Sequence, residues 1–482
     1  MAVNLPISSI LLFPLILPLL LPFLRRKHDR PLPPGPRPIP LLGNLHQQSW
    51  SEPWKTYREW HQMYGPLVSF KIGPYQVISV GTHQVAKDLL ERRGAIYSSR
   101  PESAWSQFMT KGQQPVFQSY NNSWKLMHKL QMPLLSTTAV NAYLPLLDLE
   151  TKQLLHGLVP PDRRGVNSVF AVSFHEIKTI IDGFFKDIHW TYILLDLIPG
   201  VKYMPSWMIK FKQVSDAFYK NAVRTFNRVF SRTINIQKWT WVRAVMTHRD
   251  AQKTTWEQIC FALGELWTAM SVTTPVMLMV FTRLSLLNRD KFLQLQQEVD
   301  SVCGPDRLPS PEVVEHLPYL NAYIQEMLRF DTLVPLGFLR SVDKDDEYMG
   351  YRIPANTIII PNTWCLDHDE TIYPDQYNFH PERWLADPNL PLGAFGFGRR
   401  KCPGRFLATR SMQLAIARIA WAFNIVWNAD PIPTSPRYVG FILRPRDFLG
   451  VFQPRSLERR EVIEQEWSDS ERLEDDYTDI QV

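Results

Sequence analysis

The sequence predicts a mainly helical protein with a small β region, preceded by a single membrane helix. Apolar residues recur at helical spacing in several stretches, among them residues 54–63, 83–92 and 261–287. Two short runs, from Pro66 and from Gln76, have the composition of strands and are joined by a G-P-Y turn. A long uncharged segment at the N-terminus predicts the membrane helix. Each of these observations is developed below in the order of the chain.

The N-terminal segment is long and apolar enough to cross a bilayer. Residues 5–24 contain no charge, and a span needs about 20 such residues. Four prolines interrupt the run, which membrane helices tolerate better than soluble ones. Arg25, Arg26 and Lys27 follow at once, so the positive-inside rule places the rest of the chain in the cytosol. No small-residue cleavage site follows, so a cleaved signal peptide is the less favoured alternative.

The remaining chain divides by composition. Residues 25–44 are basic and proline-rich, which predicts a stiff, extended hinge. Residues 45–455 have the pattern of a globular domain. Residues 456–482 are acidic with little apolar content, which predicts a solvated, disordered tail. We therefore expect a membrane anchor over residues 1–24, a hinge, one catalytic domain and a tail.

Bulk composition excludes several functional classes. The 482 residues exceed the usual domain of about 100–200, so the chain holds several domains or one large helical enzyme. Its four cysteines have no paired spacing, which argues against a disulfide framework and a zinc site and fits a reducing compartment. The net charge of +6 is modest, and no long basic run is present, so we expect no nucleic-acid binding.

One stretch, residues 395–408, concentrates the chemistry. It places Cys402 between a glycine-rich loop and the start of an apolar helix. Gly396 and Gly398 permit close backbone approach, and the helix start offers unpaired N–H groups that stabilise a thiolate. Arg400, two residues earlier, is a partner for an acidic group. The residues suit an iron ligand, because Cys axially ligates haem in one enzyme class; the alternative is a buried structural cysteine.

This stretch resembles the haem-binding signature of the cytochrome P450 family, F-x-x-G-x-R-x-C-x-G. The positions that match are Phe395, Gly398, Arg400, Cys402 and Gly404. The resemblance implies the mostly helical cytochrome P450 fold and a haem cofactor. It also implies that Cys402 is the axial ligand of the haem iron.

Three further residues are implied as contacts of the haem propionates. Trp124 and His128 are four apart, so they share a helix face. The family typically has Trp-x-x-x-Arg here; His128 replaces the Arg, and the charge of an imidazole depends on pH. Arg340 is the third residue.

A pair of charges on one helix predicts a structural support for the cysteine loop. Glu326 and Arg329 are three apart and share a helix face. Alone, such a pair is usually solvated and weak. With Arg383 in the later P-E-R-W segment, however, it resembles the buried ion-pair triad that lies beneath the haem loop in this family.

The long apolar helix departs from the family pattern. W-T-A-M-S-V-T-T aligns with A/G-G-x-D/E-T-T/S and matches at Ala269 and Thr273. Thr273 is therefore the predicted catalytic hydroxyl; the alternative is a threonine on an ordinary core helix. Met270 replaces the expected Gly, and Val272 replaces the expected acid. Valine cannot relay a proton, and methionine adds bulk where an oxygen groove is expected.

The resemblance is to fungal microsomal members of secondary metabolism. It implies a monooxygenase that oxidises an apolar small molecule, most readily a polyketide-type metabolite, with O2 and electrons from NADPH–cytochrome P450 reductase. It implies the endoplasmic reticulum membrane, with the catalytic domain facing the cytosol. Two alternatives stay open. One is a haem–thiolate isomerase or dehydratase, which would explain Met270 and Val272. The other is a catalytically impaired haem protein, because residues 159–258 are shorter than the matching region of most relatives.

Overall fold

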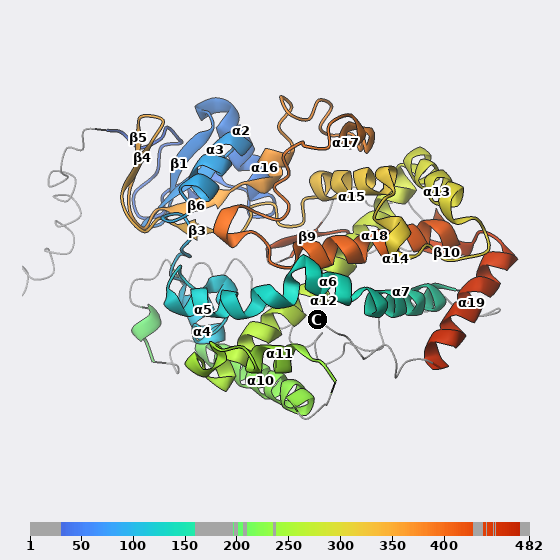
Figure 1. The fold of residues 1–482 in the computed structure, drawn as a ribbon. Coiled ribbons are helices and arrows are strands. Elements are labelled where there is room, and N and C mark those ends of the chain that lie inside the picture. The colour runs from blue at the N-terminus through green and yellow to red at the C-terminus, as the bar shows by residue number, and fades with distance from the viewer. Residues whose placement is uncertain are drawn as a thin grey trace, which may run out of the picture.

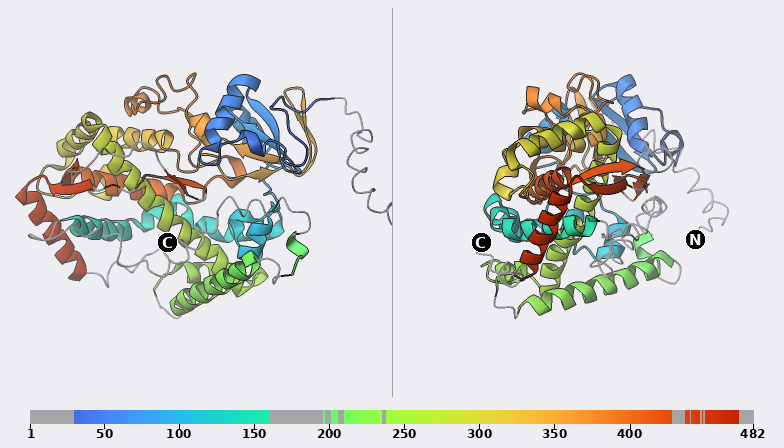
Figure 2. Two further views of the ribbon diagram at one scale, coloured as in Figure 1. Left: turned by 180° about the vertical axis from the view of Figure 1, so that it is seen from behind. Right: turned by 90° about the vertical axis from the view of Figure 1, so that its right-hand side faces the viewer.

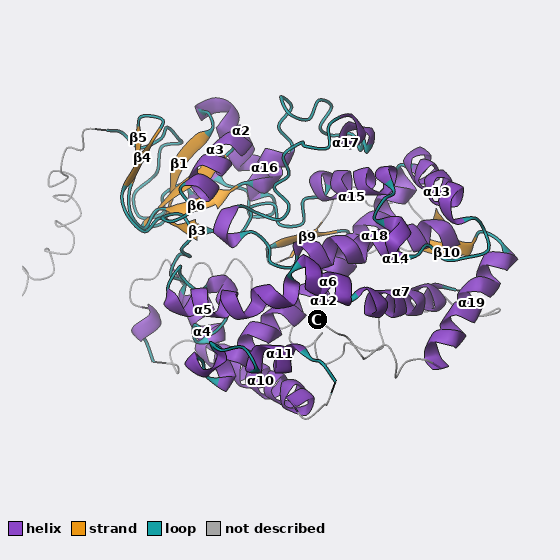
Figure 3. Cartoon of the chain, in the orientation of Figure 1, coloured by secondary structure: helices purple, strands orange, loops and turns teal. Residues whose placement is uncertain are grey.

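The computed structural model describes residues 30–159, 196, 201–205, 210–234, 238–427, 437–439, 441–446, 448 and 450–472. Helices form most of the described body, the main sheet lies at one end of it, and smaller strand pairs lie elsewhere (Figure 1; Figure 3). The predicted anchor, the first residues of the hinge and the last ten residues of the predicted tail lie outside the described residues. So do residues 175–185, for which the sequence also predicts a helix.

The helices fall into an N-terminal, a middle and a C-terminal group. The first group comprises α2 (Pro53–Tyr64), α3 (His83–Ala86), η2 (Lys87–Arg92), α4 (Ala104–Thr110), η3 (Pro115–Phe117), α5 (Asn122–Gln131), η4 (Met132–Leu135), α6 (Thr137–Ala142) and α7 (Leu144–Leu158). The middle group comprises α10 (Lys210–Ile234), α11 (Trp241–Met246), α12 (Trp256–Leu287), α13 (Arg289–Cys303), α14 (Pro311–Val314) and α15 (Pro318–Phe330). The last group comprises α16 (Thr363–Asp367), α17 (Glu382–Ala386), η9 (Gly398–Arg400), α18 (Arg405–Ala422) and α19 (Leu457–Arg472).

The main sheet has the strand order β1-β2-β6-β3. Its strands are β1 (Leu67–Ile72), β2 (Tyr75–Val80), β6 (Ile358–Pro361) and β3 (Arg340–Ser341). The two predicted strands are confirmed as β1 and β2, an antiparallel pair in which Leu67 faces Val80. Gly73, at φ +55°, makes the tight turn between them. Three two-stranded sheets complete the β region: β4 (Asp346–Tyr348) with β5 (Tyr351–Ile353), β7 (Phe423–Trp427) with β10 (Gly450–Pro454), and β8 (Arg437–Val439) with β9 (Ile442–Arg444).

Helix α12 runs through the middle of the body and packs on α5, α10, α13 and α18 (Figure 2). It begins in a capping box, in which the side chains of Thr255 and Gln258 each bond the other's backbone N–H. Gly264 lets α10 approach closely, because a Cβ there would lie 2.6 Å from the ring of Phe226. By length and composition α12 would suffice to cross a membrane, yet half of its most apolar window is buried in the body. It is the core helix of this fold.

The secondary structure of two segments differs from the prediction. The sequence predicts an irregular segment over residues 98–117, but the structure has α4 there, and the Ser103 side chain accepts the Ser106 N–H at its start. Apolar residues at helical spacing predict that the helix after Cys402 includes Phe423, but the helix runs from Arg405 to Ala422, and Phe423 begins strand β7.

The predicted disordered tail is wrong for residues 457–472, which form α19 and pack against α7. Ile463 is only 1% exposed and belongs to the main hydrophobic core. The Arg459 guanidinium forms an ion pair with Asp300 at 3.0 Å and also donates to the Trp421 carbonyl oxygen. The acidic composition of the segment predicted disorder because it gives no sign of these few contacts. They are enough to attach one face of a polar helix to the body.

The described part of the proline-rich hinge contains no helix up to residue 38, but residues 39–44 form a turn closed by a bridge between Ile39 and Gly43, and residues 31–35 are bonded to the sheet region. The Ser69 N–H donates to the Pro34 carbonyl oxygen at 2.9 Å, and the Ser69 hydroxyl donates to that of Pro33 at 2.7 Å. The Arg352 N–H donates to the Pro31 carbonyl oxygen at 2.9 Å. Gly35 allows this contact, since a Cβ there would lie 1.9 Å from the Ser69 carbonyl oxygen.

Candidate functional site

Cys402 lies on a tight loop between η9 and α18. Its N–H donates to the Phe395 carbonyl oxygen at 2.8 Å, which closes the loop. Gly396 and Gly398 adopt φ values of +71° and +53°, a region that favours glycine. A Cβ at Gly398 would lie 2.2 Å from the Leu90 carbonyl oxygen, so the loop also depends on close approach to η2. The signature residues therefore fix the position of the sulfur.

Cys402 differs from the other cysteines in its access. Cys260, Cys303 and Cys365 are buried, whereas Cys402 is partly exposed. Burial of the site raises the pKa of the Cys402 thiol, while the backbone N–H of Gly404 and the charge of Arg405 act in the opposite direction. A coordinated metal ion deprotonates such a thiol outright. Cys402 is thus placed to act as a thiolate ligand once a metal is present.

The three predicted residues of the triad come together in the structure. Arg329 donates from Nε and Nη2 to the two carboxylate oxygens of Glu326, each at 2.8 Å, and both side chains are completely buried. Arg383 approaches the same carboxylate at 3.2 Å. The Trp384 indole N–H and the His380 backbone N–H also donate to it, each at 2.9 Å. One buried carboxylate therefore ties α15 to α17 and to the segment before α17.

Three buried or largely buried arginines gather beside the loop: Arg340 and Arg400, both predicted from the sequence, and Arg100. Their described hydrogen bonds all go to backbone carbonyl oxygens, namely those of Val116, Phe338 and Leu339 for Arg100, of Leu90, Tyr97 and Phe397 for Arg340, and of Ser98, Pro115 and Gln118 for Arg400. Burial lowers the pKa of each, and the charge of Arg100 lowers it further in the other two. Arginine keeps its charge in proteins. The cluster therefore holds three positive charges that have no carboxylate partner in the described hydrogen bonds.

Trp124 and His128 share one face of α5, as predicted, and their rings stack with centroids 4.6 Å apart. The Arg400 guanidinium lies 4.0 Å above the Trp124 ring. Burial, and then the charge of Arg400, lower the pKa of His128. The imidazole is therefore neutral near pH 7, and it could meet a carboxylate only through an N–H group. The predicted contact of Trp124 and His128 with a propionate stays a prediction.

The middle of α12 is more open than the rest of that helix. Residues 267–275 are partly or fully accessible, whereas buried residues precede and follow them. The Thr273 hydroxyl donates to the Ala269 carbonyl oxygen at 2.9 Å. Met270 packs against the core cluster formed with α5 and α10. The predicted catalytic hydroxyl thus lies on an accessible stretch, and its catalytic role stays a prediction.

Sequence reasoning missed two residues of this region, Arg100 and Glu265. Glu265 lies on α12, and its Oε2 accepts the Val116 N–H at 2.8 Å. Burial raises the pKa of Glu265 to about 7, although the Val116 N–H, Arg400 and Arg100 oppose the shift. Neither residue belongs to a spacing pattern in the sequence. Only the fold brings them to the loop.

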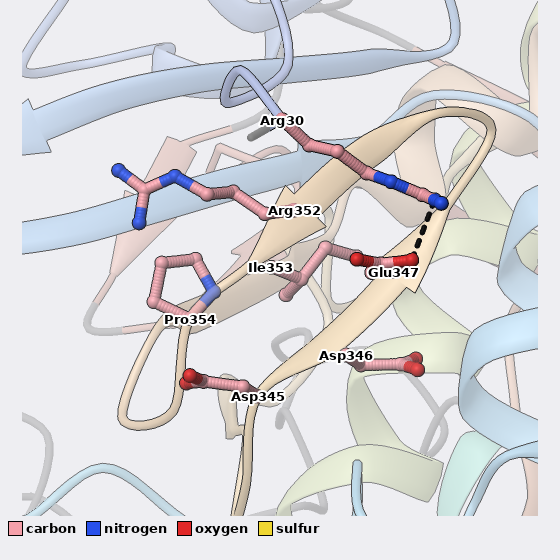
Figure 4. A pocket seen from close by; sticks show the side chains of 7 residues that line it. All are labelled: Arg30, Asp345, Asp346, Glu347, Arg352, Ile353 and Pro354. Atoms are coloured by element: carbon pink, nitrogen blue, oxygen red, sulfur yellow. Dashed lines mark ion pairs between the residues drawn. The ribbon is translucent and has the colours of Figure 1, made fainter. Parts of the chain in front are cut away.

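A separate surface pocket, of about 490 Å³, lies at the β4–β5 hairpin (Figure 4). An ion pair between Arg30 and Glu347, at 2.5 Å, crosses it. Its remaining lining residues are Asp345, Asp346, Arg352, Ile353 and Pro354. None of the residues marked by the motifs lines this polar pocket, so it is distinct from the candidate site.

The candidate site fits a haem group in two respects. Haem carries two propionate carboxylates, and the three arginines offer buried cationic donors without carboxylate partners in their described hydrogen bonds. Haem iron takes a cysteine thiolate as its proximal ligand in one enzyme class, and Cys402 is the accessible cysteine of the four. Cationic side chains without carboxylate partners can bind the propionates, and one partly exposed cysteine can bind the iron.

Comparisons with known proteins agree. The sequence model of the family described as Cytochrome P450 matches residues 33–449. The chain is 34% identical over 469 residues to the cytochrome P450 monooxygenase criE of Aspergillus cristatus, covering 92% of this chain and 88% of the relative. It is 34% identical, with the same coverage, to the echilunin cytochrome P450 monooxygenase of Aspergillus ruber. It is 33% identical over 465 residues to the cytochrome P450 monooxygenase peniB of Penicillium patulum, covering 91% of this chain and 87% of the relative.

These matches cover most of the chain and of each relative, so the fold, the haem cofactor and the reaction class expected from the cysteine loop are confirmed. The family uses O2, an organic substrate and a redox partner that supplies electrons. The chain belongs to the cytochrome P450 family and is a monooxygenase related to those of fungal secondary metabolism.

Proposed function

We propose that this monooxygenase oxidises an apolar secondary metabolite, of polyketide type, with electrons from NADPH–cytochrome P450 reductase. The observation that carries the proposal is the accessible Cys402 beside three arginines whose described hydrogen bonds go only to carbonyl oxygens. When bound, haem supplies the oxygen-activating chemistry, and the protein supplies binding, orientation and proton delivery. Resemblance to members that oxidise polyketide-derived aromatics supports the substrate class.

Each group of residues has a proposed part in the reaction. Cys402 is the thiolate ligand, and Arg100, Arg340 and Arg400 hold the propionates. Thr273 keeps a hydroxyl on the accessible stretch of α12, where it would orient water for proton delivery.

An aromatic cluster is the proposed wall for the substrate. Trp105 and Phe108 of α4 pack together with Phe117 and with Phe211 of α10. The rings of Trp105 and Phe117 meet edge to face, with centroids 5.3 Å apart. Such a wall offers apolar area and few hydrogen-bonding groups, so it favours a hydrophobic, aromatic-rich substrate.

The proposed docking face for the reductase is a set of exposed cations near the cysteine loop: Lys125, Lys129, Arg399 and Lys401. Lys129 also pairs with Asp250 at 2.5 Å, so part of its charge is neutralised. An acidic partner would bind this face faster at low salt, because exposed charges are screened at high ionic strength. Charge reversal at Lys401 should raise the reductase concentration needed for half-maximal turnover.

The proposed location is the endoplasmic reticulum membrane, with the catalytic domain in the cytosol. Support comes from the uncharged run over residues 5–24 and the basic residues that follow it. Fractionation of cells that express the full chain tests this proposal. The protein should remain with membranes after a carbonate wash and be open to protease from the cytosolic side.

A second candidate function is a haem–thiolate isomerase or dehydratase. The specific observation in its favour is Val272, which leaves the accessible stretch of α12 without an acid. Such an enzyme would bind substrate at the iron but would consume no reductase electrons.

One set of measurements separates these functions. The purified protein is reduced and exposed to carbon monoxide, and a thiolate-type Soret band is expected. Cys402→Ser should abolish that band, whereas the matched variant Cys303→Ser should keep it. Substrate-dependent NADPH consumption with reductase then supports the monooxygenase, and conversion of substrate without NADPH supports the alternative. Absence of the band from the unchanged protein would overturn both.

A variant restores the expected distal residues. The double change Met270→Gly and Val272→Asp supplies the missing acid and removes the bulk from α12. If proton delivery limits the unchanged enzyme, the share of NADPH that ends in hydroxylated product should rise. An unchanged share would show that Met270 and Val272 do not impair oxygen activation.

A further inference from the structure

Helix α12 contains an acid that the reaction described so far does not use. The only acids along this helix are Glu257 and Glu265. Glu257 lies in the first turn and accepts the Tyr219 hydroxyl. Glu265 lies seven positions before Val272. Seven residues make almost two turns, so Glu265 and Val272 share a helix face about 10 Å apart.

Glu265 is joined to the arginine cluster through the backbone of one residue, Val116. Its Oε2 accepts the Val116 N–H at 2.8 Å, and the Val116 carbonyl oxygen accepts the Nε–H of Arg100 at 2.9 Å. Arg400 donates to the Gln118 carbonyl oxygen at 2.6 Å, two residues further along. The segment around η3 therefore bonds Glu265 on one side and Arg100 and Arg400 on the other. The charges of both arginines act on the Glu265 carboxylate.

The charges of the site also favour an anion at Glu265. Three guanidinium groups, those of Arg100, Arg340 and Arg400, stand against two propionates. Glu265 supplies the third negative charge and makes these groups neutral together; Glu91, whose charge also acts on Arg340, is exposed, so solvent screens it. One more electron on the cofactor would make it negative, and a net charge is unfavourable in a medium of low dielectric constant.

We propose that Glu265 is the acid that takes up a proton when the cofactor is reduced. An electron arrives from the redox partner, a proton arrives from solvent, and an O–H bond forms on the Glu265 carboxylate. The net charge of the site is then unchanged by reduction. This inference rests on the haem binding proposed above. Glu265 is a positioning residue, because it acts on the cofactor through its own charge and through the groups that it bonds.

The surroundings of Glu265 are suited to this exchange. Burial raises its pKa to about 7, and the opposing groups are the Val116 N–H, Arg400, Arg100 and the side chain of Gln131. An added negative charge nearby raises the pKa of a carboxyl group further. Near pH 7 the group is therefore only partly ionised before reduction, and reduction should raise its protonated share. The proton on Glu265 then lies on the same face of α12 as Val272, the position where the family pattern has an acid.

The test measures the midpoint reduction potential of the haem-loaded protein at a series of pH values around 7. The potential of the unchanged protein should fall as pH rises through this range. Glu265→Gln keeps an acceptor for the Val116 N–H but cannot change charge, so its potential should be higher at pH 8 and much less dependent on pH. Any dependence that remains belongs to the propionates. The matched variant Glu257→Gln should behave as the unchanged protein does.

Infrared difference spectra give a second readout, which reports protonation of the carboxyl group directly. Reduction should produce a C=O band of a protonated carboxylic acid in the unchanged protein, and this band should be missing from Glu265→Gln. If Glu265→Gln loses haem, Glu265→Asp replaces it and should shift the pH range of the transition.

Two results would overturn the proposal: a pH dependence that is equal in the unchanged protein and in Glu265→Gln, or an unchanged protein that gives no C=O band on reduction. Both leave the thiolate Soret band in place, so they are distinct from a failure of haem binding. Loss of that band from the unchanged protein would instead refute the haem site and this inference together.

Discussion

Replacing Glu326 by Gln is expected to destabilise the protein strongly while keeping the shape of the side chain. The carboxylate accepts two hydrogen bonds of 2.8 Å from Arg329 and one each from the Trp384 indole and the His380 backbone N–H, and it pairs with Arg383 at 3.2 Å. Both Glu326 and Arg329 have no exposed surface. The variant therefore leaves a buried guanidinium without its counter-charge.

The magnitude follows from that burial. Removing one partner of a buried ion pair costs about 3–5 kcal/mol, which is a large part of the roughly 5–15 kcal/mol by which a typical domain is stable. Urea unfolding, followed by circular dichroism and by the Soret band in parallel, should show a clear fall in the midpoint. Haem should be lost at a lower urea concentration than in the unchanged protein, because Arg329 also donates to the carbonyl oxygen of Asp367, and the Asp367 carboxylate accepts the N–H of Gly393 just before the cysteine loop.

A matched control separates burial from simple loss of charge. Glu52 forms an ion pair with Lys55 at 2.6 Å and with the same three-residue spacing, but both side chains are about half exposed. Glu52→Gln should cost at most about 1 kcal/mol. The double change Glu326→Gln with Arg329→Met should recover part of the lost stability, since it removes both charges. Equal midpoints for Glu326→Gln and Glu52→Gln would refute the reasoning.

The other predictions concern the core, the loop and pH. Ile463→Ala should cost about 2–5 kcal/mol in urea unfolding because the side chain is 1% exposed, whereas Leu457→Ala, at a side chain 78% exposed, should cost almost nothing. Gly398→Ala should abolish the thiolate Soret band because its Cβ would lie 2.2 Å from a carbonyl oxygen; Gly350→Ala, at φ +80° with no atom within 4 Å, should keep it. The pKa of His128 is lowered in the fold, so the unfolded state binds a proton more readily than the folded state. The free energy of unfolding should therefore fall as pH drops below about 6.5. His128→Asn should reduce that fall.

The sequence predicted the parts of the site that depend on local spacing. Cys402 and its glycines are adjacent in the chain, and Glu326 and Arg329 lie one helical turn apart. Patterns of this kind constrain geometry directly, because a turn or a helix face fixes the relative positions of near neighbours. The helices and the first two strands were predictable for the same reason.

The parts that were missed depend on tertiary contacts. Arg100 and Glu265 both bond the backbone of Val116, one at its carbonyl oxygen and the other at its N–H, although 165 positions of the numbering separate them. Nothing in the local sequence around either residue indicates that meeting. Helix α19 was missed because its average composition is acidic, while its packing rests on single residues such as Ile463.

The attachment of residues 31–35 to the sheet has a practical consequence for expression of soluble forms. A truncation at residue 45, the predicted boundary of the catalytic domain, would remove the carbonyl groups of Pro33 and Pro34 that Ser69 bonds. The β1 backbone would then expose a donor at its edge, which is a known route to intermolecular strand pairing. A chain that starts at residue 30 or 31 keeps this edge covered and is the better starting point for crystallisation.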